Sequence, residues 1–308
     1  MNDCIALALG FVCAGIGGEF FVRGAVGLAH WARVSPGIIG ATIAAFATSS
    51  PELAVAVNSA LVGKPEISFG DALGSNVVNI ALILAVGLLI SGIQSPRDTI
   101  KRDFPVALLV PVIIGVLFLD GVLSRIDGLL LLGMFIAWFV AVIIEARKQR
   151  NATEKILGER RSWLAIILCT AGLVLLVAAG RLIVVGAKSI AISLGIGEFV
   201  TGAIIVAVGT SVPELATVII AKIRRHDEVG LGTILGSNIF NGLFIIPVAA
   251  IICPISVDWH KVAVALVIGL LSVVFTFPTR RGFIGRRRGV VLLLLYAVYL
   301  ATILQRQA

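Results

Sequence analysis

The chain has 308 residues, of which 59% are hydrophobic and 14% charged, and its mean hydropathy is +1.09. A soluble domain carries about a quarter charged residues, so this composition excludes an ordinary soluble protein and indicates helices in a lipid bilayer. The net charge of +8 does not indicate nucleic-acid binding, because the basic residues cluster in short loops, as they do in membrane proteins.

Apolar runs long enough to cross a bilayer as a helix recur along the whole chain. They predict an all-α integral membrane protein with ten transmembrane helices, at 4–28, 37–63, 69–93, 104–119, 127–146, 163–187, 197–223, 230–253, 260–277 and 288–305. The start of the chain, Met1–Asp3, lacks the basic segment of a signal peptide, so we expect the first run to be retained.

The loops that follow the odd-numbered helices hold most of the lysines and arginines. The positive-inside rule therefore places these loops in the cytoplasm and both termini outside, in a multi-pass protein of the cell (inner) membrane. The longest of them, about 147–162, is too short for a folded domain. The four cysteines (Cys4, Cys13, Cys169 and Cys253) form no C-x-x-C pair and predict neither a zinc site nor a disulfide framework. We expect no cofactor, and the sequence predicts no protein partner.

One block of the sequence occurs twice, with an offset of 162 residues. Gly40, Thr48, Ser49, Pro51, Glu52, Gly74, Ser75, Asn76 and Asn79 match Gly202, Thr210, Ser211, Pro213, Glu214, Gly236, Ser237, Asn238 and Asn241. The two copies, about 40–80 and 202–242, lie in halves 1–146 and 163–308. Each half contains five predicted helices, an odd number, so the second half enters the membrane from the opposite face. The sequence therefore predicts two inverted five-helix repeats, an architecture typical of secondary transporters.

The repeated block carries a glutamate in the middle of an apolar run, which is costly in a membrane and indicates a functional site. Thr48 precedes Glu52 by four residues and Ser49 precedes it by three, so the three share one face of a helix. Pro51 lacks an N–H group, so we expect the Ala47 carbonyl to be left without its helical partner. The second copy repeats this arrangement with Thr210, Ser211 and Glu214, and Pro213 is expected to free the Gly209 carbonyl.

The third and eighth predicted helices add a second polar stripe. Ser75 and Asn79 are four residues apart, as are Ser237 and Asn241. The glycines of these helices (Gly70, Gly74, Gly232 and Gly236) are expected to permit close helix contacts. A site built only from oxygen atoms favours hard cations over zinc or copper. Its two carboxylates balance one divalent or two monovalent cations, which motivates an exchange mechanism.

Glu19 and Arg23 are also four residues apart inside an apolar run, and this spacing predicts an ion pair. Arg181 stands where the repeat would place the counterpart of Glu19, so the symmetry fails there. We expect a structural or gating role for this group rather than ion ligation.

The motif Gly-x-x-x-x-Ala-x-x-Thr-Ser-x-Pro-Glu-Leu, followed by Gly-Ser-Asn-x-x-Asn and present twice, resembles the two repeats of the cation/Ca²⁺ exchanger superfamily. It is most similar to the compact prokaryotic sodium/calcium exchangers, over nearly the whole chain. The resemblance implies exchange of cytosolic Ca²⁺ for external Na⁺, and sliding of helices 1 and 6 across the other eight. It implies ion ligands at the side chains of Glu52, Glu214, Thr48, Thr210, Ser49, Ser211, Ser75, Ser237, Asn79 and Asn241 and at the carbonyls of Ala45 and Ala207.

Other functions remain open on sequence grounds. The glutamates can carry protons, which suits H⁺/Ca²⁺ exchange. Some archaeal members of the superfamily carry aspartate where this chain has Asn241, and potassium-dependent members also carry an acid in the second repeat. The absence of that acid argues against potassium-dependent exchange. A cation channel could use the same ligands, but the inverted repeat disfavours it. An intramembrane hydrolase would need an activated nucleophile, and no His, Lys or second acid lies near Ser49 or Ser211 in the sequence.

Overall fold

A computed structural model describes residues 3–153, 162–193 and 207–305, which are mostly helical. The first half contains α1 (Asp3–Ala32), α2 (Pro36–Ile39), η1 (Gly40–Ala44), α3 (Ala45–Thr48), α4 (Ser50–Leu61), α5 (Pro65–Val77), η2 (Val78–Leu84), α6 (Ala85–Ile90), α7 (Arg97–Leu117) and α8 (Arg125–Thr153). The second half contains α9 (Ser162–Ser193), α11 (Ala207–Thr210), α12 (Val212–Ile223), α13 (Asp227–Phe240), η4 (Asn241–Ile245), α14 (Ile246–Ile252), α15 (Trp259–Thr276) and α16 (Arg286–Gln305).

Helical structure is present in each of the ten predicted ranges, as far as the described residues extend. By length and composition, five described helices are apolar and long enough to cross a membrane, or six if the bent pair Pro36–Thr48 and Ser50–Leu61 counts as one span. The helix α8 continues to Thr153, so the loop predicted from residue 147 begins later than expected. Residues 154–161 of that loop, and 194–206 with Gly202, lie outside the described part.

The apolar segments are interrupted by local changes of helix geometry. η1, η2 and η4 are π-helical stretches inside longer helical runs, a feature often found at functional sites. A sharper break separates α3 from α4 at Ser49, where the axis bends by 45°. Pro51 follows this break, and Pro213 follows the equivalent break at Ser211. Backbone angles are nearly identical at Ser49 (φ −86°, ψ 9°) and Ser211 (φ −86°, ψ 8°), so the sequence repeat is reproduced in backbone conformation.

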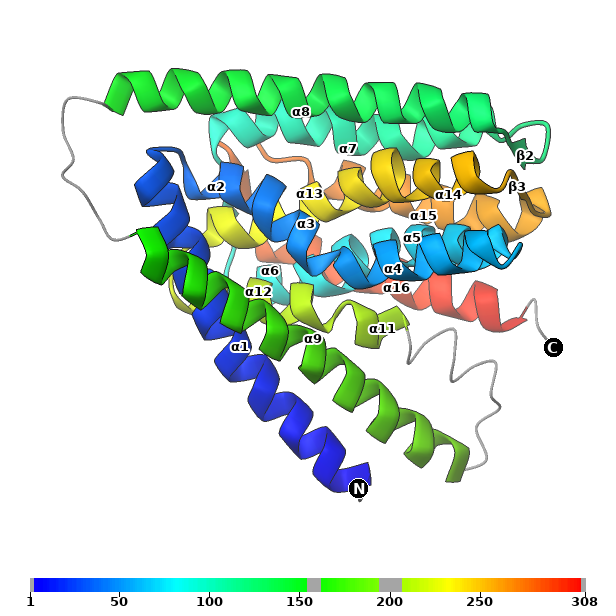
Figure 1. The fold of residues 1–308 in the computed structure, drawn as a ribbon, viewed down its shortest axis with the longest axis horizontal. Helices are drawn as coiled ribbons and strands as arrows, with labels where there is room; N and C mark the ends of the chain where they lie inside the picture. The colour runs from blue at the N-terminus through cyan, green and yellow to red at the C-terminus, as the bar shows by residue number, and fades with distance from the viewer. Residues whose placement is uncertain (1–2, 154–161, 194–206, 306–308) are drawn as a thin grey trace.

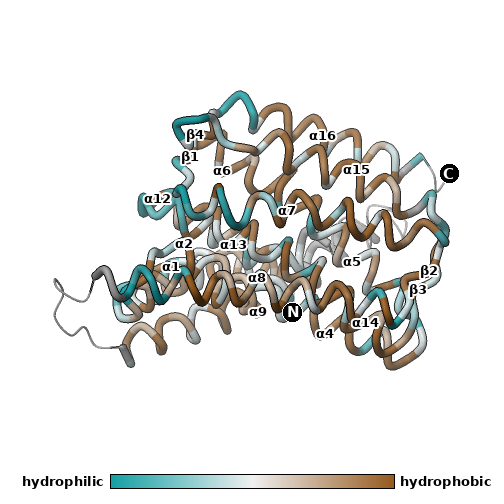
Figure 2. Tube along the Cα trace, turned by 90° about the horizontal axis from the view of Figure 1, so that it is seen from above, coloured by the Kyte–Doolittle hydropathy of each residue, from teal (hydrophilic) through white to brown (hydrophobic). Residues whose placement is uncertain are grey.

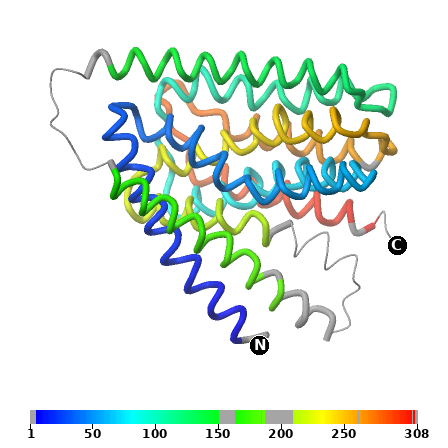
Figure 3. Tube along the Cα trace, viewed as in Figure 1, coloured from blue at the N-terminus to red at the C-terminus, as the bar shows by residue number. Residues whose placement is uncertain are grey.

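Most helices run side by side along the length of the molecule, and α7 and α8 form one side of this bundle (Figure 1). The helices α1 and α9 cross the bundle obliquely and lie against one another, although they are far apart in the sequence (Figure 3). Their contact is backbone to backbone, since a Cβ placed on Gly24 would lie 2.4 Å from the Cys169 nitrogen, and one on Gly172 would lie 2.4 Å from the Phe21 nitrogen. We call α1 and α9 the crossing pair, and the remaining helices the body.

Two short antiparallel strand pairs connect the halves. β1 (Ile93–Gln94) pairs with β4 (Phe283–Ile284), and β2 (Val122–Leu123) pairs with β3 (Ile255–Ser256). These pairs lie at opposite ends of the molecule, where the chain is more hydrophilic than along the helices (Figure 2). The sequence did not predict these strands. Each pair joins a loop of the first half to a loop of the second.

The centre of the body is formed by the two glycine- and asparagine-containing helical runs. In the most apolar 18-residue stretch of each run, 83% of the residues are buried in 227–252 and 67% in 65–90. The corresponding share is 33% for each helix of the crossing pair. Gly236 permits a close contact with η1, because a Cβ there would lie 2.4 Å from the Ala41 carbonyl oxygen. The predicted close packing is therefore confirmed for Gly232 and Gly236, which contact the segment 37–41. The equivalent segment for Gly70 and Gly74 is 199–203, which lies outside the described residues.

Candidate ion-binding site

The two helix breaks carry the repeat glutamates into the interior. Glu52 is 2% exposed and Glu214 is 1% exposed, and each lies in the first turn after its break, in α4 and α12. A helix N-terminus favours negative charge, so the break helps to hold a carboxylate at membrane depth. Thr48, one helical turn before Glu52, contacts Ser237, and Ser237 in turn contacts Glu214. The structure therefore brings together the two acids that the sequence singled out.

Hydroxyl groups from both halves connect the regions around the two helix breaks. The Thr48 hydroxyl lies 3.5 Å from the Ser237 hydroxyl, and Ser237 donates to Glu214 Oε1 at 3.4 Å. Thr48, Ser49, Ser75, Ser211 and Ser237 are each at most 1% exposed, and Thr210 is partly buried. Thr48 of α3 and Ser237 of α13 are thus in contact across the two halves, and the other predicted hydroxyl residues are buried or partly buried in the neighbouring segments.

Several oxygens of these residues are buried with no hydrogen-bond partner among the described residues. They are Ser49 Oγ, Glu52 Oε2, Ser75 Oγ, Asn79 Oδ1, Ser211 Oγ, Glu214 Oε2 and Asn241 Oδ1. A buried polar atom without a partner is costly, and one such atom in a native protein needs an explanation. Among the described residues, Ser68 Oγ on α5 is the one other buried side-chain oxygen without a partner, so seven of eight belong to residues predicted as ion ligands. A hard cation is a partner that many oxygens can share.

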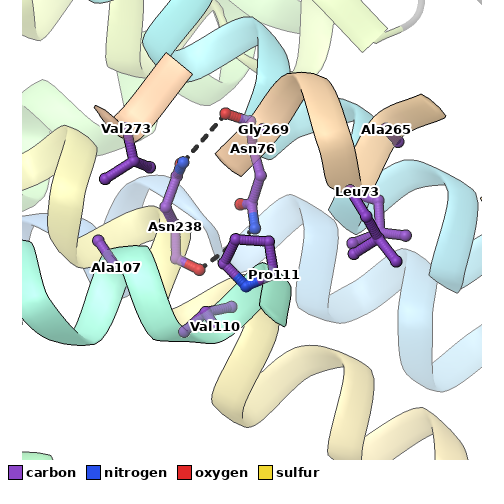
Figure 4. Close-up of a pocket in the computed structure, with 10 residues that line it drawn as sticks. Leu73, Asn76, Ala107, Val110, Pro111, Asn238, Ala265, Gly269 and Val273 are labelled. Carbon is purple, nitrogen blue, oxygen red and sulfur yellow. Dashed lines mark hydrogen bonds between the residues drawn. The ribbon is translucent and has the colours of Figure 1, made fainter. Parts of the chain in front are cut away.

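Asparagines from the two halves meet between α5–η2 and α13–η4. Asn76 Nδ2 donates to the Asn238 carbonyl at 3.3 Å, and Asn238 Nδ2 donates to the Asn76 carbonyl at 3.0 Å (Figure 4). Asn79 Nδ2 donates to Asn238 Oδ1 and Asn241 Nδ2 donates to Asn76 Oδ1, both at 3.0 Å. Asn76 and Asn238 are repeat-related positions that were not predicted as ligands. Their spacing of three residues from the predicted ligands places them on a neighbouring part of the same helix.

The backbone carbonyl that Pro51 cannot bond has another partner in the protein. Pro51 has no N–H group to offer the Ala47 carbonyl, and Ser50 Oγ donates to this oxygen at 2.7 Å instead. In the second copy Val212 stands at the position of Ser50 and offers no hydroxyl. The Ala45 carbonyl accepts the Ser49 N–H at 3.0 Å and the Thr48 hydroxyl at 3.4 Å. Ala207 begins α11, so its backbone lies one turn before the second break.

A third acid, which the sequence analysis did not single out, lies near the site. Asp71 is on α5, four residues and about one turn before Ser75. The repeat places Thr233 at the equivalent position, and its hydroxyl donates to the Val229 carbonyl at 2.8 Å. The acid is therefore confined to one half. Its four-residue spacing from Ser75 was the signal available in the sequence.

Glu19 lies outside this site and joins the crossing pair to the body. The predicted ion pair with Arg23 is present, and Arg224 at the end of α12 donates to Glu19 through Nε at 2.8 Å. Arg224 had not been predicted as a partner.

A crevice separates α4 from α9. It extends from the prolines after the two breaks, Pro51 and Pro213, to Val62 beyond the end of α4, and Arg181 lies on its α9 wall. Its other lining residues include Ala54, Val55, Asn58, Val177, Gly180 and Thr210. The crevice therefore reaches the region of the candidate site from one end of the molecule.

The sequence model of the sodium/calcium exchanger protein family matches residues 3–144 and 164–305, nearly the whole chain. The chain belongs to this family. It is 38% identical over 247 residues to the putative antiporter CaxA of Alkalimonas amylolytica, covering 77% of each chain. It is also 32% identical over 301 residues, 96% of each chain, to an uncharacterized membrane protein of Methanocaldococcus jannaschii.

The fold is that of a solved family member. The structure of the sodium-calcium exchanger NCX_Mj soaked with 2.5 mM Na⁺ and 10 mM Sr²⁺ matches with a TM-score of 0.83 and 31% identity, over 97% of this chain and 98% of that chain. The protein is therefore a membrane-spanning cation/Ca²⁺ exchanger, and its relatives are transporters rather than enzymes.

Proposed function

We propose that this exchanger is a Na⁺/Ca²⁺ antiporter in which Glu52 and Glu214 form one shared ion site. The observation that carries the proposal is the group of seven buried, unpartnered oxygens, all from repeat-related residues around two buried carboxylates. The hydroxyls of Thr48, Ser49, Ser75, Thr210, Ser211 and Ser237, the amide oxygens of Asn79 and Asn241, and the carbonyls of Ala45 and Ala207 complete the proposed ligand set.

Charge and ligand chemistry explain why exchange follows from such a site. Two carboxylates balance one Ca²⁺ or two Na⁺, and both ions take oxygen ligands. An empty site would leave the carboxylates close together and uncompensated at membrane depth, which is unfavourable. Release of one ion set is therefore favoured when the other set takes its place.

The same proposal includes ten transmembrane helices in two inverted halves, 1–146 and 163–308. The strand pairs support it, because β1 and β3 stand at positions 162 residues apart and yet lie at opposite ends of the molecule. In the predicted topology both termini lie on the outer side of the cell (inner) membrane, and so does the loop after α4. The crevice that ends at Val62 then opens to the exterior. The arrangement then represents one stage of alternating access, with the site reached from outside.

Na⁺ is favoured as the coupling ion by the relatives with assigned ions. NCX_Mj and the archaeal protein MaX1 of Methanosarcina acetivorans, 29% identical over 97% of this chain, are named as sodium/calcium exchangers. Mammalian sodium/potassium/calcium exchanger 2 matches only 19% of the chain. H⁺/Ca²⁺ exchange is the second candidate, since both glutamates can be protonated.

Transport by the purified protein in liposomes tests the coupling ion. Vesicles loaded with Na⁺ should take up external ⁴⁵Ca²⁺, and Glu52→Gln or Glu214→Gln should abolish the uptake because the site loses half of its charge. Glu66→Gln, which alters an exposed acid at the start of α5, is the matched control and should transport normally. Uptake driven by a proton gradient without Na⁺ would replace Na⁺ by H⁺, and uptake that needs no counter-ion would indicate a channel.

A further inference from the structure

We propose that Asn76 and Asn238 are positioning residues that orient the amides of Asn79 and Asn241 so that both oxygens face the transported cation. The proposal rests on the ion site proposed above and adds residues that contact the ligands but not the ion. The reciprocal hydrogen bonds between Asn76 and Asn238 close a ring across the two halves, and Asn79 and Asn241 each donate into it. We call these four asparagines the amide ring.

The orientation of the amide ring is dictated by two backbone carbonyls. A carbonyl can only accept a hydrogen bond, so the Asn76 amide must turn its nitrogen toward the Asn238 carbonyl, 3.3 Å away. Its oxygen then faces Asn241 and must receive a donor, which is Asn241 Nδ2 at 3.0 Å. In the same way, Asn238 Nδ2 donates to the Asn76 carbonyl, and Asn238 Oδ1 therefore accepts from Asn79 Nδ2.

The constraint ends on the two proposed ligands. Because Nδ2 of Asn79 and Nδ2 of Asn241 are both directed into the ring, their Oδ1 atoms point away from it. Both oxygens are buried and have no partner among the described residues. If either amide were reversed, it would present N–H groups to the ion site, and these repel a cation.

The environment of the ring leaves few competing contacts for Asn76 and Asn238. A small cavity borders them on the side of α7 and α15 (Figure 4), and the remaining residues that line it are Leu73, Ala107, Val110, Pro111, Ala265, Leu266, Gly269 and Val273. Since these side chains are apolar, the amides find their polar partners within the ring. Each proposed ligand is thus oriented by an asparagine of the opposite half.

A structural role alone is the alternative, because asparagines commonly join helices in membranes by hydrogen bonds. The two roles predict different results when the ligand is a group that binds the cation equally well in either orientation. A carboxylate has an oxygen on both branches, so Asn79→Asp needs no positioning partner. In that background the Asn238 oxygen faces another acceptor, and its removal relieves a repulsion.

A double-mutant cycle of Asn238→Leu and Asn79→Asp tests the proposal in the full-length protein. In the wild-type background we expect Asn238→Leu to raise the Ca²⁺ concentration for half-maximal uptake about 10- to 100-fold, the usual effect of losing a partner that orients a ligand. In the Asn79→Asp background the same substitution should change it less than about threefold, or lower it. Calcium-dependent shifts of the melting temperature in detergent should follow the same pattern without requiring transport.

Equal losses in both backgrounds would overturn the proposal and leave the ring as a structural connection. The repeat-related cycle of Asn76→Leu and Asn241→Asp provides the second test if the first pair does not fold, and the same two outcomes decide it. Wild-type protein and Glu52→Gln are measured in parallel. If the wild type neither binds nor transports Ca²⁺, the proposed function fails, whereas an additive cycle in an active transporter rejects only the role of the amide ring.

Discussion

The two helices of the crossing pair occupy equivalent positions in the repeat but contact the body differently. Gly18 of α1 lies against α12, where a Cβ would be 3.2 Å from the Ala216 carbonyl oxygen, and Glu19 bonds Arg224 at the end of the same helix. Gly180 of α9, 162 residues later, instead lies against α11, where a Cβ would be 2.8 Å from the Gly209 carbonyl oxygen, while a crevice separates α9 from α4. The asymmetry thus lies in how the pair packs on the body, since the backbone breaks within the body are nearly identical.

This difference assigns separate tasks to the two regions. The body holds the repeat-related oxygens in a closely packed centre. In the mechanism proposed above, the position of the crossing pair decides which end of the molecule reaches them. Disturbing the body should therefore reduce folding and transport together. A change at the pair should alter access to the site while the fold is retained.

The largest effect is expected from Gly236→Ala in the body. The added methyl group would lie 2.4 Å from the Ala41 carbonyl oxygen, so α13 and η1 must separate. Overpacking of this kind costs about 1–3 kcal/mol or more, and we expect a melting temperature lower by several degrees and loss of ⁴⁵Ca²⁺ uptake. Gly133→Ala on α8, where the described residues leave the space open, should be neutral or slightly stabilising. Equal stability of the two variants would contradict the close packing of the body.

An intermediate effect is expected from filling the crevice with Ala54→Trp. Ala54 is exposed on α4 and lines the crevice opposite α9, so an indole there should obstruct the route to the site. We expect uptake to fall at least tenfold with an unchanged melting temperature. Ile143→Trp on the exposed face of α8 controls for the added bulk. Normal uptake by the Ala54 variant would show that ions reach the site by another route.

The smallest effect is expected from Arg224→Gln, which releases Glu19 from the body. Exposed ion pairs contribute about 0.2–1 kcal/mol, so the proposed equilibrium between outward-open and inward-open positions of the crossing pair should shift about 1.4- to fivefold. Labelling of an Asn58→Cys variant by a membrane-impermeant maleimide should slow by that factor, because Asn58 lines the crevice. Arg225→Gln, its neighbour, serves as the control. An unchanged labelling rate would mean that the Glu19 pair does not hold α1 in place.

Features that depend on local pattern were predictable from the sequence. Apolar runs located the helices, and the repeated Pro and Glu located the breaks and the acids that the structure brings together. Three-dimensional partners were not predictable in the same way. Nothing in the spacing of Ser50 showed that its hydroxyl would occupy the Ala47 carbonyl, and Arg224 is 205 residues from Glu19. The amide ring was missed because its bonds join different halves, and only Asn79 and Asn241 belong to the ligand pattern of the family.

The two short strand pairs restrict how such a molecule can change shape. Each end of the body is fastened by a strand of one half hydrogen-bonded to a strand of the other. A rocking motion that separates the two halves at one end would have to break the hydrogen bonds of one strand pair in every transport cycle. The crossing pair contains none of the four strands, so a shift of this pair along the body leaves both strand pairs intact. The body that holds the proposed ion ligands then keeps its structure throughout the transport cycle.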